Sequence, residues 1–140
     1  MHNDTVCLLG ECAVGLGRTV LTMEELLPEI KDHRLRGTLR QSCREYAELL
    51  DTARQQLSAH GQLPIKSGRA AAWLLANTRM ALRHDDMTAA YVVAEICDRD
   101  IKNLCRSRNR YNGAAVSAVD LAQQLIDREE KLSAAMRPFL

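Results

Sequence analysis

Four long stretches of the chain carry apolar side chains that recur every three or four positions. This spacing places the apolar side chains on one face of an α-helix. Only three prolines and seven glycines interrupt the 140 residues, which favours long helices over many short strands. We therefore expect α-helices over residues 5–27, 33–60, 87–109 and 114–136.

Each expected helix has one stripe that should face a shared core. The stripe of helix 5–27 is Leu9, Cys12, Leu16, Val20, Met23 and Leu27. That of helix 33–60 is Leu39, Cys43, Tyr46, Leu50, Ala53 and Leu57. That of helix 87–109 is Ala90, Ala94, Cys97, Ile101 and Leu104, and that of helix 114–136 is Val119, Ala122, Ile126, Leu132 or Ser133, and Met136.

Residues with known roles at helix ends separate these stretches. Pro28 ends the first helix, and Asp32 is a suitable N-cap for the second. Gly61 ends the second helix, as glycine often does at helix C-termini. Asp85 or Asp86 can cap the third helix, and Asn112-Gly113 predicts a turn before the fourth.

The connections predict how the helices are joined. Short links within the first and second pairs predict two antiparallel hairpins. A further alanine-rich helix is expected from residue 69 to 82 or 83, and at 1.5 Å per residue it would span ~20 Å. It can carry the chain back along the bundle as a crossover. The predicted fold is one all-α domain, residues 1–140: an antiparallel four-helix bundle with an additional crossover helix between its second and third long helices.

Composition narrows the function. Nineteen basic and eighteen acidic residues leave a formal charge of +1, which gives no general attraction to nucleic acid or anionic lipid. We see no secretory signal at the start of the sequence, and expect no window apolar enough to span a membrane. The five cysteines show no CxxC spacing and are expected to be small buried side chains in a reducing cytoplasm.

Several short segments resemble the ferritin-like superfamily, in order and spacing along most of the chain. They are Lys31-Asp32 with Leu35, the segment 44–49, the 61–64 turn, Ser67-Gly68 before Trp73, Asp85-Asp86, and Asp98 with Asp100. The nearest resemblance is to a small bacterial group of rubrerythrin-related bundles of unknown function. The resemblance implies the bundle fold and its single long crossover, and it specifies no activity.

A ferritin-like di-metal centre requires inward-facing glutamates and Glu-x-x-His pairs. The four histidines are expected at helix ends or turns, and none follows an acid at that spacing. The stripe of helix 5–27 contains no carboxylate. Asp98 and Asp100 are expected at the flanks of their helix, with Cys97 and Ile101 facing inward. No metal site is therefore expected, and no catalytic residue is assigned.

Glu129 is the exception among the acids, because it falls on the apolar stripe of its helix. A buried unpaired carboxylate costs several kcal/mol, so we expect Glu129 to pair with an arginine or tyrosine or to reach the rim. An iron or manganese site remains the alternative. Its ligands would come from five acids, Glu45, Asp98, Asp100, Asp127 and Glu129.

The leading hypothesis is a non-enzymatic bundle that acts by associating with itself, as a homodimer, or with another protein. The helix at residues 69–83 has apolar residues on more than one side, and glycines in helix 5–27 leave a smooth surface. The expected interface residues are Gly15, Gly17, Trp73, Leu74 and Met80. A third hypothesis is an adaptor that binds RNA or another anion through Arg106, Arg108 and Arg110.

Overall fold

Four long helices form the part of the protein that the computed structural model describes, residues 2–61 and 85–140. They are α1 (His2–Leu26), α2 (His33–Ala59), α4 (Asp86–Arg110) and α5 (Val116–Met136). Short 3₁₀ turns follow α1 (Leu27–Glu29) and α5 (Arg137–Phe139). The two described ranges contain no strand, so the all-helical prediction is confirmed. The crossover helix expected at 69–83 lies outside the described residues.

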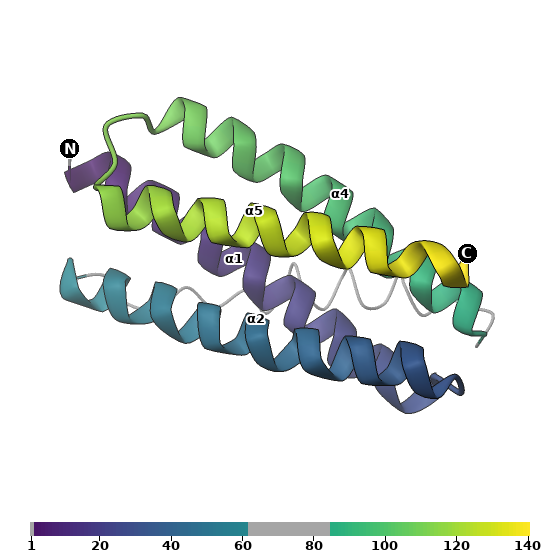
Figure 1. The fold of residues 1–140 in the computed structure, drawn as a ribbon. Helices are drawn as coiled ribbons and strands as arrows, with labels where there is room; N and C mark the ends of the chain where they lie inside the picture. The colour runs from purple at the N-terminus through teal and green to yellow at the C-terminus, as the bar shows by residue number, and fades with distance from the viewer. Residues whose placement is uncertain (1, 62–84) are drawn as a thin grey trace.

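The four helices pack side by side, with α1 and α5 running in one direction and α2 and α4 in the other (Figure 1). Hydrogen bonds at both ends of the bundle fix this arrangement. Near the start of α1, Thr5 Oγ1 accepts a hydrogen bond from the Ala115 amide at 2.8 Å. At the other end, the Asp86 carboxylate accepts hydrogen bonds from the Lys31 and Asp32 amides, each at 2.9 Å.

Buried side chains from all four helices form one core cluster. The predicted stripes supply most of it, because their side chains project toward the bundle axis at helical spacing. Five stripe residues are only half-buried: Leu27, Cys43, Ala94, Ile101 and Val119. All five cysteines are free thiols, and Cys12 and Cys97 are fully enclosed.

The segments between the helices follow the predicted chemistry. Asp32 caps α2 by accepting the amides of Arg34 and Leu35, and Asp85 caps α4 by accepting that of Thr88. Gly61 has φ +76°, the left-handed conformation that glycine adopts easily at a helix C-terminus. The turn predicted at Asn112-Gly113 also forms, without a positive φ at Gly113, and the Gly113 amide donates to Asp4 Oδ2 at 3.0 Å.

The expectation about membrane-spanning length was wrong for α1. The segment Asn3–Glu29, most of α1 and the 3₁₀ turn after it, is long and apolar enough to cross a membrane, judged by length and composition alone. Within the chain, however, 61% of that window is buried. α1 packs against the other three helices, and a core helix of a bundle meets the same criterion. The segment therefore gives no evidence for or against a membrane.

Candidate functional site

Two carboxyl side chains lie inside the bundle, Asp100 from α4 and Glu129 from α5. Asp100 is 2% exposed and Glu129 is 0% exposed. We call them the acid pair. Two neighbouring residues of α1 contact Asp100: Arg18 Nη2 lies 3.2 Å from its Oδ1, and Thr19 Oγ1 lies 2.8 Å from its Oδ2. The two acids come from α4 and α5, and the residues that contact Asp100 come from α1, so three helices meet at this point.

The position of Asp100 corrects the prediction that it lies at the flank of its helix. Residues 100 and 101 both follow Cys97 at a spacing compatible with the inward stripe, and the prediction chose the apolar one. In the structure Asp100 is buried and Ile101 is half-buried. Arg18 and Thr19 explain the difference, because an opposite charge and a hydroxyl donor reduce the free-energy cost of burying a carboxylate.

The pKa values of both acids are raised. Burial is the main cause for Glu129, followed by the nearby charge of Asp100. Burial also raises the pKa of Asp100, but its contacts with Thr19 and Arg18 act in the opposite direction. Cys97 and Arg18 also lower the pKa of Glu129, but burial and the charge of Asp100 outweigh them, whereas Asp100 has Arg18 and Thr19 in direct contact. We therefore assign the carboxylate to Asp100 and the proton to Glu129. The two groups nevertheless titrate as a coupled pair.

Tyr46 and Cys97 are the other polar side chains beside Glu129. Burial raises the pKa of each, and ionisation of Glu129 would raise both further. Neither group is therefore ionised near neutral pH. Within the described residues, the Tyr46 hydroxyl and both Glu129 carboxyl oxygens lack a hydrogen-bond partner. The prediction that Glu129 pairs with an arginine or tyrosine or reaches the rim was wrong: it is fully buried beside another acid, and although Tyr46 lies near it, no hydrogen bond joins the two.

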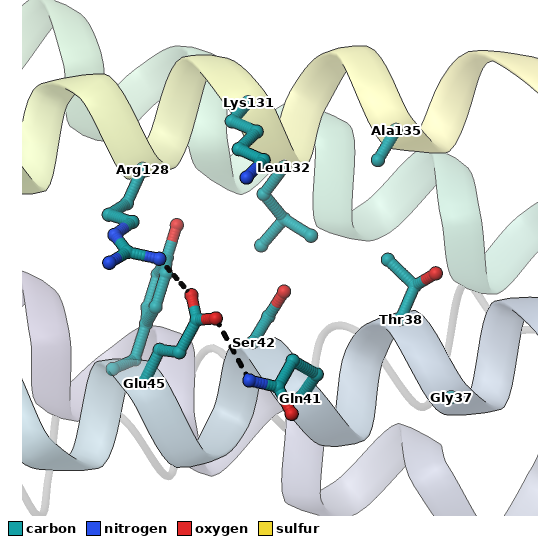
Figure 2. A pocket seen from close by; sticks show the side chains of 10 residues that line it. Gly37, Thr38, Gln41, Ser42, Glu45, Arg128, Lys131, Leu132 and Ala135 are labelled. Carbon is teal, nitrogen blue, oxygen red and sulfur yellow. Dashed lines mark hydrogen bonds and ion pairs between the residues drawn. The ribbon is translucent and has the colours of Figure 1, made fainter.

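A groove between α2 and α5 adjoins this buried cluster (Figure 2). It has a volume of about 360 Å³, and Tyr46 and Leu132 form part of its wall. Tyr46 lines the groove and also lies near Glu129, so it connects the groove to the acid pair. We call this hollow the α2–α5 groove.

Polar side chains line the groove from both helices. Arg128 of α5 forms an ion pair with Glu45 of α2, and Gln41 Nε2 donates to Glu45 at 3.0 Å. Figure 2 shows Thr38 and Ser42 on the α2 side, and Lys131 on the α5 side. None of these last three side chains forms a hydrogen bond or ion pair with another described residue.

The five acids of the metal hypothesis do not come together. Glu45 is paired with Arg128 in the groove, Asp98 accepts from Ser133 Oγ at 2.9 Å, and Asp127 accepts from Gln123 Nε2 at 2.9 Å. Only Asp100 and Glu129 meet. Among the described residues there is no group of three or more metal-binding side chains. The acid pair alone therefore supplies fewer ligands than an iron or manganese site needs.

The predicted interface residues are only partly described. Trp73, Leu74 and Met80 lie outside the described residues, and Gly15 and Gly17 are buried within the chain. The structure instead exposes three large apolar side chains around one hollow of about 390 Å³. Met87 is 58% exposed, Tyr91 56% and Leu140 54%. These three residues, which we call the apolar end patch, lie where α4 begins and α5 has ended.

The predicted anion-binding arginines lie near the end of α4. Arg106 and Arg110 line a hollow of about 460 Å³ that also contains Glu11. Arg108 hydrogen-bonds to Gln123, and the Arg110 guanidinium lies 5.5 Å from the centre of the Tyr111 ring. Two of the three cations therefore have partners within the chain, and a carboxylate shares the hollow of Arg106.

Comparisons with protein-family models, with curated proteins and with solved structures found no match. The function is therefore inferred from the side chains themselves. Sequence reasoning missed Arg18 and Thr19, which give the acid pair its charge balance. A signal was present: Arg18 is the one arginine or lysine in α1.

Proposed function

We propose that this chain is a non-catalytic, ferritin-like helical bundle that acts by self-association through the apolar end patch. The observation that carries the proposal is the exposure of Met87, Tyr91 and Leu140 around one hollow. Contiguous exposed apolar surface is costly in water and commonly marks an interface. The acid pair offers no comparable case for catalysis, because Glu129 has no exposed surface for a substrate to reach.

A second copy of the chain is the partner that best fits this patch. The hollow is lined by Met87, Thr88, Tyr91 and Leu140, so no charged side chain selects an oppositely charged partner. A two-fold axis would place the same apolar surface against itself. The formal charge of +1 adds little repulsion between two copies.

The ferritin-like topology is part of the proposal. It is supported by the two hairpins and by the shared direction of α2 and α4 (Figure 1). α2 ends at one end of the bundle and α4 begins at the other. The connection must therefore return along a bundle whose 25-residue α4 is ~37 Å long at 1.5 Å per residue. The crossover helix expected at residues 69–83, ~20 Å long, would cover about half of that distance.

Light scattering coupled to size-exclusion chromatography tests the association. We expect wild-type protein at micromolar concentrations to have twice the mass of one chain, and Tyr91→Glu to shift it to the monomer. Val116→Glu is the matched control, because Val116 is 76% exposed but lies at the opposite end of the bundle. The proposal fails if wild-type protein is monomeric throughout, or if the control dissociates as readily as Tyr91→Glu.

A remnant iron or manganese site is the second candidate. It is supported by the meeting of Asp100 and Glu129 inside the bundle and by the two Glu129 oxygens that lack a described partner. Elemental analysis of protein grown with both metals separates it from the first candidate. About one or two equivalents per chain, lost in Asp100→Ala and Glu129→Ala, would favour the metal. Binding of RNA or another anion is a third candidate, and retention on heparin that depends on Arg106 would support it.

A further inference from the structure

We propose that the α2–α5 groove binds a small organic carboxylate with a short apolar body. The groove is independent of the apolar end patch, so this inference does not rest on self-association. Its volume of about 360 Å³ falls at the lower end of the ~300–1,000 Å³ found for small-molecule sites. Its size therefore favours a metabolite-sized ligand over a peptide or nucleic acid.

Charge in the groove favours a monoanion. Arg128 and Glu45 neutralise each other through their ion pair. Lys131 is left as a cation without a partner in the described part of the chain. The net charge of the lining is therefore +1, which balances one carboxylate and is insufficient for a phosphate dianion. An ammonium group also forms strong, charge-assisted hydrogen bonds with carboxylates.

Hydrogen-bond donors complement this charge. Thr38 and Ser42 are one turn apart on α2, so their side chains lie on the same face of the helix. Both are half-buried, and neither hydroxyl bonds to another described residue. Across the groove, Leu132 extends from α5 toward α2 (Figure 2). The hydroxyls and Lys131 thus suit a carboxylate, while Leu132 and the Tyr46 ring suit an apolar body.

Gly37 provides an independent reason to regard the groove as a site. Glycine inside a helix costs ~1 kcal/mol relative to alanine, so it normally needs a structural reason. Gly37 lies within α2, its φ is not positive, and a Cβ placed there would meet no atom within 4 Å. Neither backbone conformation nor close packing requires glycine. Because Gly37 lines the groove and has no side chain, it leaves one end of the groove open.

Hexanoate, paired with the uncharged hexanamide, is a suitable probe. We expect hexanoate to cause saturable shifts in amide NMR signals of residues 37–46 and 128–135 in the full chain. Hexanamide should bind at least fivefold more weakly, since it cannot pair with Lys131. Lys131→Gln should weaken hexanoate binding to a similar extent, and Lys102→Gln, the same change on an exposed part of α4, should leave it unaltered.

Gly37→Leu separates ligand binding from folding. The leucine Cβ would meet no atom within 4 Å, and leucine raises the helix propensity of α2, so the variant should unfold at a higher temperature. We expect it to lose hexanoate binding at least tenfold. The inference is overturned if hexanoate causes no saturable shifts in these two segments, if Lys131→Gln and Lys102→Gln behave alike, or if Gly37→Leu binds as wild type.

Discussion

Glu129→Gln tests the assignment of the proton within the acid pair. Glutamine keeps the approximate shape of the side chain but cannot ionise. In the folded protein, burial and the charge of Asp100 raise the pKa of Glu129 well above its ordinary value of 4.5. In the unfolded chain that pKa is expected to return to about 4.5. Between these two pKa values the folded protein holds a proton that the unfolded chain has released.

The sign and size of the pH effect follow from this difference. A raised folded-state pKa gives stability that is complete at low pH and is lost as pH rises toward the folded-state pKa. One proton changes the free energy of unfolding by ~1.4 kcal/mol per pH unit. Wild-type stability should therefore fall with that slope above about pH 4.5. The raised pKa of Asp100 acts in the same direction.

Urea unfolding followed by circular dichroism measures this slope. Subtracting the wild-type free energy of unfolding from that of Glu129→Gln cancels the contributions of titrating groups that do not interact with Glu129. The difference should rise by ~1.4 kcal/mol per pH unit from about pH 4.5 upward. Glu130→Gln, at the exposed neighbouring position, is the control. A difference that stays constant with pH would falsify the assignment, because Glu129 would then gain and lose its proton alike in both states.

Three further changes probe the surrounding structure. Arg18→Met leaves Asp100 without its counter-ion and should lower the free energy of unfolding by ~2–3 kcal/mol in urea titrations, below the ~3–5 of a fully buried pair because the Arg18 side chain is 26% exposed. Asp86→Ala removes two hydrogen bonds to the α1–α2 connection and should cost ~1–2 kcal/mol, part of which Asp86→Asn should restore. Burial raises the pKa of Cys12 from 9.0 to about 12, a roughly thousandfold smaller thiolate fraction, so mass spectrometry after iodoacetamide treatment should find Cys7 and Cys105 alkylated long before Cys12 and Cys97.

Local signals were sufficient for the helices and their ends. The expected bounds of helix 33–60 differ from α2 by a single residue, and Asp32 and Gly61 act as predicted. These features depend on a few consecutive residues: a cap, a glycine that adopts positive φ, and apolar spacing along one helix. Such information is present in the sequence without knowledge of the packing.

The acid pair depends on contacts that local patterns do not contain. Asp100 and Ile101 fit the stripe of α4 almost equally well, and the choice is made by Arg18 and Thr19, more than eighty residues earlier in the chain. The α2–α5 groove is similar, because its width depends on how two helices are spaced. Glu129 was recognised as inward-facing from its own helix, but its neighbour Asp100 was not. Contacts between distant parts of the chain thus decide which residue faces inward where the apolar spacing fits two neighbouring positions.

Charge balance inside the bundle determines what the metal alternative would require. With Arg18 positive, Asp100 negative and Glu129 protonated, the described interior is neutral and needs no further cation. A divalent ion between the two acids would have to displace the proton of Glu129, and with Arg18 in place the group would carry a net charge of +1 in a low-dielectric core. Metal binding should therefore release a proton and move Arg18 toward solvent, where its side chain already has partial access. Metal-loaded protein that retained the Arg18–Asp100 ion pair would contradict this charge balance.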